Sequence, residues 1–301
     1  MEPFRLEHEH AGDQPGIVTL WLEQGDRPVV VLDHDLVLRL ELTLKALPAN
    51  AAGLVLASAA PRAFVAGADL KAIVELDDAR LHAYLANASR VFAMISALPY
   101  FTAAAIHAAA LGGGLELAMH CDGLIGCPPA DRDGKPGRPY PIGLPEAGLS
   151  ICPGWGGTNL LPARMDPAEA IRRTATGKPM TSAEAISAGL FDSVAETPET
   201  LIETARSWIR NQAGPVHRTG SPGRWIGCPD VSAAVLSALD AVRDELTTPS
   251  GMAVCEAVDT GLAKGWRAAL AVEQDHLVRL RSTPAGQAAI EAFFAKSAKK
   301  A

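Results

Sequence analysis

Short apolar segments alternate with segments of helical periodicity, and this alternation constrains the fold of the chain most strongly. Residues 17–22, 53–57 and 102–106 are short and apolar, as buried strands are. A helix is predicted from Asp35 onward, where leucines recur at helical spacing up to Pro48: Leu36, Leu40, Leu44 and Leu47. A second helix is predicted over residues 78–98. Strands that alternate with helices indicate an α/β layered fold.

The chain becomes predominantly helical from about residue 167. Helical patterns cover residues 167–174, 182–188, 198–211, 231–246, 252–281 and 284–295. Segments 128–141 and 213–230 are rich in glycine and proline, so we expect loops there. We therefore divide the 301 residues into a core, residues 1–212, and a C-terminal helical extension, residues 213–301.

Charge and cysteine content exclude several classes of protein. The formal net charge is −7 and no broad basic region occurs, which argues against a nucleic-acid-binding protein. Residues 91–115 carry no Asp, Glu, Lys or Arg, but Pro99 and three glycines interrupt the stretch, so we expect no membrane span. The start lacks a secretory signal pattern. The five cysteines form no C-x-x-C pair. We expect a cytoplasmic protein with buried free thiols and no metal site.

Three short motifs could carry chemistry. The first, residues 61–71, follows a strand and contains Ala66-Gly67-Ala68-Asp69-Leu70-Lys71, whose small residues allow a ligand to approach the backbone closely. In the second, residues 111–117, Gly112-Gly113-Gly114 opens a helix, and the free N–H groups of a helix start suit a developing anion. The third joins Pro145-Glu146 to residues 153–158, Pro-Gly-Trp-Gly-Gly-Thr.

Each motif also has a purely structural interpretation. Asp69 would cap the following helix, and the three glycines would form a packing turn. Glu116, early in its helix, would complement the helix dipole, while Glu146 would be a solvated loop carboxylate. Lys71 would be an ordinary surface side chain.

Taken together and in this order, the motifs resemble those of the enoyl-CoA hydratase/isomerase (crotonase) family. The resemblance covers roughly residues 15–212. It implies a core spiral of ββα units, followed by C-terminal helices that cover the site or a neighbouring subunit. It also implies a homotrimer or a dimer of trimers. The tail, residues 282–287 with Phe293 and Phe294, is similar to the hydratase half of multifunctional fatty-acid oxidation proteins.

The resemblance assigns backbone groups to an acyl-coenzyme A substrate. The N–H groups of Ala66 and Gly113 would form an oxyanion hole for the thioester oxygen as it becomes an enolate. Substrate binding would involve a short set of residues, namely Ala66, Gly67, Ala68, Asp69, Leu70, Gly113 and Gly154.

The resemblance also supplies an acid and a base. Glu116 would activate water for attack at C3, and Glu146 would donate a proton at C2. The N–H of Gly154 would help to orient the water. Coenzyme A would enter only as part of the substrate, and neither a nicotinamide nor a metal would be needed, since no G-x-G-x-x-G or metal-ligand pattern is present.

Three features depart from the family pattern. His107-Ala108 replaces the usual Asn-Gly, and His107 is better explained as a hydrogen-bonded core histidine than as a base. Residues 128–141 are longer than the usual connection, which would place an insertion near the mouth of the pocket. Trp155 stands where short hydratases usually have a small residue.

Hydration of a 2-enoyl-CoA is the function that these residues favour. An enoyl-CoA isomerase, which needs one carboxylate, is the main alternative. Thioester hydrolysis, dehalogenation and decarboxylation on the same fold also stay open, as does a non-catalytic acyl-CoA-binding relative. The retention of both Glu116 and Glu146 favours hydration.

Overall fold

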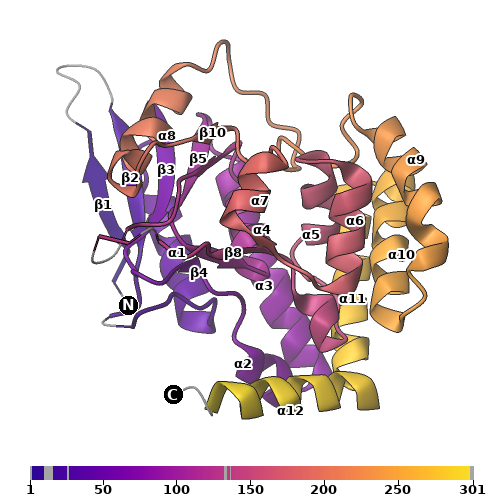
Figure 1. Cartoon of the computed structure of the whole chain (residues 1–301). Coiled ribbons are helices and arrows are strands. Elements are labelled where there is room, and N and C mark those ends of the chain that lie inside the picture. Colours follow the sequence, from indigo (N-terminus) through magenta and orange to yellow (C-terminus); the bar gives the residue numbers. More distant parts are fainter. Residues whose placement is uncertain (1, 10–15, 26, 132–133, 136, 299–301) are drawn as a thin grey trace. The chain divides into compact units, whose positions relative to one another are not determined.

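The computed structural model describes residues 2–9, 16–25, 27–131, 134–135 and 137–298 (Figure 1). It has the expected mixed α/β fold and forms two compact units. The first unit contains residues 1–68, 88–142 and 180–224, and the second contains residues 69–87, 143–179 and 225–301. This division does not follow the boundary predicted at residue 212, because two earlier segments group with the C-terminal helices.

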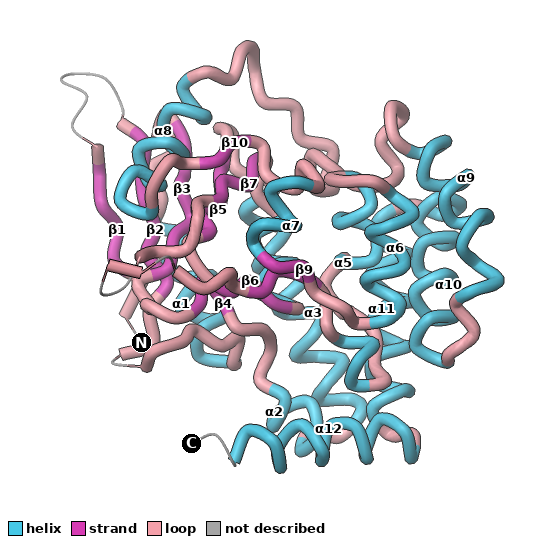
Figure 2. The backbone as a smooth tube through the Cα atoms, in the orientation of Figure 1, coloured by secondary structure: helices cyan, strands magenta, loops and turns pink. Residues whose placement is uncertain are grey.

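A six-stranded sheet, ordered β1-β2-β3-β5-β7-β10, forms the centre of the first unit (Figure 2). Its strands are β1 (Arg5–His8), β2 (Ile17–Leu22), β3 (Gly53–Ser58), β5 (Thr102–Ile106), β7 (Gly123–Gly126) and β10 (Ser193–Val194). Strand β1 is antiparallel to β2, and all other neighbours are parallel. The three strands expected from the sequence are therefore confirmed.

Helices of the first unit are α1 (His34–Ala46), α4 (Gly113–Met119), α7 (Ser182–Ser187) and α8 (Leu201–Arg210), which follows the 3₁₀ helix η3 (Pro198–Thr200). Helix α1 begins after Asp33, whose side chain accepts a hydrogen bond from the N–H of Leu36. Helix α8 packs on the sheet through Leu201, Ala205 and Ile209, which join the apolar core around β3, β5 and β7.

A second sheet, ordered β4-β6-β8-β9, positions the glycine turn. Its strands are β4 (Ala63–Val65), β6 (Ala109–Leu111), β8 (Pro141–Gly143) and β9 (Met180–Thr181). Strands β4 and β6 are parallel, and α4 starts two residues after β6. A Cβ atom at Gly114 would lie 2.3 Å from the carbonyl oxygen of Val65, so α4 packs on β4 at a distance that only glycine permits.

The second unit is mostly helical. Its elements are α2 (Leu70–Glu75), the first part of α3 (Asp78–Ser96), η1 (Glu146–Leu149), α5 (Gly157–Leu160), η2 (Leu161–Ala163), α6 (Pro167–Thr176), α9 (Ser232–Val242), η4 (Arg243–Glu245), α10 (Pro249–Lys264), α11 (Trp266–Arg281) and α12 (Pro284–Ala298). Helices α6, α9 and α10 lie side by side (Figure 1). The stretch expected to be helical over 252–281 is two helices, because Gly265 has a φ of +88° between them.

Apolar burial accounts for several sequence features. The sequence predicts an apolar stripe over residues 266–280 that needs either a partner surface or the chain's own core: Trp266, Leu270, Leu277 and Leu280. Within this chain Leu270 is partly buried and the other three are buried, so the stripe does not require a partner chain. All five cysteines are free thiols, as expected, and only Cys228 among them is partly exposed. None of the described helices is long and apolar enough to span a membrane.

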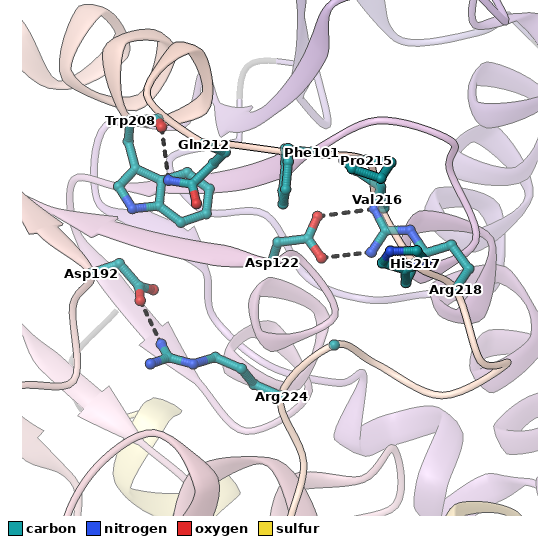
Figure 3. Close-up of a pocket in the computed structure, with 11 residues that line it drawn as sticks. Phe101, Asp122, Asp192, Trp208, Gln212, Pro215, Val216, His217, Arg218 and Arg224 are labelled. Atoms are coloured by element: carbon teal, nitrogen blue, oxygen red, sulfur yellow. Dashed lines mark hydrogen bonds and ion pairs between the residues drawn. The ribbon is translucent and has the colours of Figure 1, made fainter. Parts of the chain in front are cut away.

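Two arginines hold the segment that follows α8 against the first unit. Arg218 donates to both oxygens of Asp122 at 2.6 and 3.0 Å, and also to the carbonyls of Leu98 and Tyr100. Arg224 pairs with Asp192 at 2.5 Å. Together they line a cavity of about 450 Å³ (Figure 3). Asp122 and Asp192 immediately precede β7 and β10, so the cavity lies at the amino ends of these parallel strands.

Replacement of Asp122 by Asn should loosen this segment. The carboxylate also accepts from the N–H and hydroxyl of Thr102, and an amide keeps only one acceptor oxygen. We expect a loss of about 2–4 kcal/mol in the free energy of unfolding, because the mostly buried Arg218 loses its counter-charge.

The matched control is Asp259→Asn, which disrupts a similarly two-pronged but more exposed pair with Arg243. This control should cost about 1 kcal/mol or less. Equal losses in urea denaturation of the two variants would contradict the role given to Asp122.

Replacement of Gly114 by Ala tests the close contact of α4 with β4. Helix propensity alone predicts a gain of about 1 kcal/mol. We expect instead a loss of about 1–3 kcal/mol, because the new methyl group meets the backbone of Val65 and α4 must shift. Thermal unfolding measures the sign directly, and an unchanged or raised Tm would show that the contact is not tight.

Candidate active site

The turn that follows β4 offers one backbone donor, but not the one that was expected. The N–H of Ala66 donates to the carbonyl of Val30 at 2.8 Å, so it is already used inside the first unit. Gly67 has a φ of +113°, and its carbonyl accepts from the N–H of Leu32 at 2.9 Å. The N–H of Ala68 makes no hydrogen bond to any described residue. The assignment to Ala66 therefore conflicts with its hydrogen bonding, and Ala68 is the donor that this turn leaves available.

The start of α4 offers a second donor close by. A Cβ atom at Gly67 would lie 3.3 Å from the carbonyl oxygen of Leu111, the last residue of β6. Gly113, two residues further on, is buried at the first position of α4, and its N–H likewise bonds to no described residue. Because β4 pairs with β6, the 66–68 turn and the start of α4 lie at the same end of these strands. Backbone N–H groups at such a site suit an oxygen that gains negative charge.

Glu116 lies one turn into the same helix and is 1% exposed. Its backbone carbonyl accepts from Nδ1 of His120, at 2.8 Å, so His120 carries its proton on Nδ1 when neutral. His120 is buried and packs edge-on against Phe92. No sequence pattern singles out His120, and its contacts indicate that it stabilises α4.

Glu146 opens η1 in the second unit. Its atom Oε2 is buried and has no hydrogen-bond partner among the described residues. Burial is the main cause that raises the pKa of Glu146 to about 8, and the charge of Glu273 raises it further. The structural alternative, a solvated loop carboxylate, does not fit these surroundings.

A third carboxylate, which the sequence interpretation missed, holds the 153–158 loop. Glu273 on α11 is fully buried and accepts from the N–H groups of Gly156 and Thr158, at 2.6 and 2.9 Å, and from the hydroxyl of Thr158. Burial raises the pKa of Glu273 and these donors lower it, with a net rise. The signal was its position on the apolar stripe of α11, between Leu270 and Leu277 at helical spacing.

The two residues that depart from the family pattern have structural partners. His107 donates from Nε2 to the carbonyl of Ala60 at 2.9 Å, and burial lowers its pKa, as expected of a hydrogen-bonded core histidine. Trp155 is buried, donates to the carbonyl of Leu85 at 3.0 Å and packs edge-on against Tyr84.

Other predicted residues have clear local roles. Asp69 caps α2 by accepting from the N–H of Lys71 at 3.0 Å, and the side chain of Lys71 is exposed. In the 128–141 segment, residues 132, 133 and 136 lie outside the described part of the chain. Its end is anchored by Tyr140, whose buried hydroxyl donates to the carbonyl of Cys127 at 2.6 Å.

The predicted site residues are divided between the two units. The first unit contains Ala66, Gly67, Ala68, Gly113 and Glu116. The second contains Asp69, Leu70, Glu146 and Gly154. The first group combines two unused backbone donors with a buried glutamate, and the second contains a carboxyl whose pKa is raised.

Solved structures of related fold include acyl-CoA enzymes. An enoyl-CoA hydratase from Bacillus anthracis has a TM-score of 0.59 and 24% identity, over 97% of this chain and 96% of that one. Human mitochondrial delta3-delta2-enoyl-CoA isomerase has a TM-score of 0.68 and 20% identity, over 99% and 98%. A carnitinyl-CoA dehydratase from Mycobacterium thermoresistibile has a TM-score of 0.67 and 20% identity, over 97% and 89%. At these identities the likeness concerns the fold.

Family membership rests on the sequence itself. The model of the enoyl-CoA hydratase/isomerase family matches residues 26–218, which is more than half of the chain and includes all three motifs. The chain therefore belongs to the enoyl-CoA hydratase/isomerase family.

Proposed function

We propose that this protein is an enoyl-CoA hydratase, which adds water across the 2,3 double bond of an enoyl-CoA thioester. The observation that carries the proposal is the buried Glu116, one turn after the unused N–H of Gly113 in the same helix. A carboxyl group in that position, one turn from the N–H that would bind the thioester oxygen, would be suited to activating water there.

The thioester oxygen would bind to the N–H groups of Ala68 and Gly113. When hydroxide adds to C3, electrons move through the double bond onto this oxygen and create an enolate. Donors that are already in place stabilise that charge without reorganisation. The backbone of residues 66–70 would line the coenzyme A moiety.

Glu116 would start ionised and take a proton from the attacking water. Glu146 would start protonated and deliver its proton to C2, which collapses the enolate to the 3-hydroxyacyl thioester. A raised pKa for Glu146 suits this role, since an ordinary glutamate would have lost its proton at neutral pH. The reaction moves one water and no electrons to or from a cofactor, so we expect neither nicotinamide nor metal to be needed.

The isomerase is the second candidate, because Glu146 alone would be enough to move a proton between carbons. It requires Glu146 to start as a base, and the raised pKa makes that less favourable at neutral pH. It also leaves the buried Glu116 without a role in the chemistry.

A trimer-based assembly, as a homotrimer or a dimer of trimers, is part of this proposal. It follows from family membership alone, because the apolar stripe of α11 is covered by its own unit.

Exchange of either glutamate for glutamine tests the acid and the base separately. Glu116→Gln and Glu146→Gln keep the size of the side chain and remove the ionisable group. Each should lower kcat for hydration on the order of 10²–10⁴-fold, the usual effect of a positioned acid or base. The double variant should lose much less than the product of the two, since both groups act on one transition state.

The assay follows the conjugated-enoyl absorbance of crotonyl-CoA and of a longer enoyl-CoA, with acyl-CoA binding as the control, because the backbone donors are untouched. If Glu116→Gln kept full hydration while Glu146→Gln abolished double-bond migration, the protein would be an enoyl-CoA isomerase.

The pH dependence should reflect the proton on Glu146. Since the proposed reaction consumes that proton, kcat/KM should fall as the pH rises through about 8, where the carboxyl ionises. Acyl-CoA binding measured over the same range should change little. A kcat/KM that instead rises through this range would mean that Glu146 acts as a base.

A further inference from the structure

Several side chains of α11 contact the 154–158 loop. Besides the three hydrogen bonds to Glu273, Nε2 of Gln274 donates to the carbonyl of Gly154 at 3.3 Å. A Cβ atom at Gly154 would lie 3.0 Å from the side chain of Leu277, and one at Gly156 would lie 2.2 Å from the ring of Trp266. The loop therefore takes its shape from α11, with almost no free space between them.

The same loop is continuous with the turn that carries Glu146. The carbonyl of Glu146 accepts from the N–H of Ile151 at 3.1 Å, and residues 151–160 are all buried. Gly154 thus lies within a buried segment that Glu273 fixes at residues 156–158, and the hydrogen bond to Ile151 ties Glu146 to the start of that segment. A shift at Thr158 would be passed to Gly154, because the close-packed segment 151–160 leaves little room for adjustment, and the Ile151 hydrogen bond would carry part of it to Glu146.

Hydrogen bonds stabilise a negative charge on Glu273 better than one on Glu146. Glu273 receives two backbone N–H donors and one hydroxyl, which stabilise an anion. The buried Oε2 of Glu146 has no such donor among the described residues. Because the charge of Glu273 raises the pKa of Glu146, the two carboxyl groups do not both ionise cheaply, and the proton belongs on Glu146, which has fewer donors.

Other charged side chains on the surrounding helices have partners elsewhere or are exposed. On α11 these are Arg267, Asp275, His276, Arg279 and Arg281. On α6 they are Glu169, Arg172 and Arg173, and on α12 they are Glu291 and Lys296.

We propose that Glu273 is a positioning residue for the proton donor: it fixes the 154–158 loop from α11 and keeps an anion beside the carboxyl of Glu146. This inference rests on the proposed function, in which Glu146 delivers the proton and Gly154 helps to orient the water. Glu273 itself would not touch the substrate.

Two substitutions separate the two parts of this role. Glu273→Gln keeps the size of the side chain but removes the charge, and its NH₂ group faces one of the loop donors. Glu273→Asp keeps the charge but withdraws the acceptors from the loop. We expect kcat to fall on the order of 10–100-fold in both, from displacement of the loop, with a smaller change in KM.

The titration of Glu146 gives a readout that a purely structural role would not change. Infrared difference spectra of the protein against its Glu146→Gln variant isolate this carboxyl, with no need for turnover. In the Glu273→Gln background the midpoint of the Glu146 titration should fall by about one pH unit, since a like charge is removed. In the Glu273→Asp background the shift should be smaller. The alkaline limb of kcat/KM should move in the same direction.

The control is Asp275→Asn, the same loss of charge two residues along α11 on an exposed side chain. It should match the wild type in kcat, KM and the Glu146 midpoint. If Glu273→Gln folds and leaves both kcat and the midpoint unchanged, the proposal is wrong. If the wild type has no hydratase activity but the midpoint still shifts, the proposed function fails while the coupling of the pair stands.

A milder pair of variants serves if Glu273→Gln does not fold. Thr158→Val removes only the hydroxyl donor, and Thr158→Ser retains it. The valine variant should lower kcat and the Glu146 midpoint, because Glu273 loses one support for its charge and competes for the proton. The serine variant should restore both. Equal behaviour of the two would overturn the proposal.

Discussion

The close approach of α4 to β4 is the contact on which the candidate site depends. Gly114 lies against the backbone of Val65 where no side chain would fit. This contact brings the start of α4 to the turn after β4, so that the unused N–H groups of Gly113 and Ala68 arise at the same end of two paired strands. Glu116 then follows from helix geometry, one turn from Gly113. One steric condition therefore positions a potential anion site and a buried carboxylate together.

The second unit contains two carboxyl groups, those of Glu146 and Glu273, that are shielded from solvent. A buried carboxylate is costly unless hydrogen bonds support it, and Glu273 obtains three from the 156–158 loop. Glu146 obtains no such support at Oε2 and avoids the cost by holding a proton. The same arrangement that stabilises the loop thus prepares an acid at neutral pH, which is the property that the hydration proposal needs.

Local patterns predicted most elements, and long-range contacts decided the rest. Residues 102–106 form β5 as expected, since an apolar run bounded by Pro99 and the glycine turn has few alternatives. The break at Gly265 was missed because a single glycine within a helical pattern need not interrupt it. Which N–H of the 66–68 turn is free depends on pairing with residues 30–32, more than thirty positions away. Glu273 bonds to Thr158 across 115 residues, a separation that no local pattern reports.

The most direct test of hydration is the fate of solvent atoms. Crotonyl-CoA should be incubated with the protein in H₂¹⁸O and D₂O, and the thioester products analysed by mass spectrometry. Hydration predicts a 3-hydroxyacyl-CoA that carries one ¹⁸O, bound at C3, and one solvent deuteron, bound at C2. An enoyl-CoA with a displaced double bond, with deuterium incorporated but no ¹⁸O, would contradict the account and identify an isomerase.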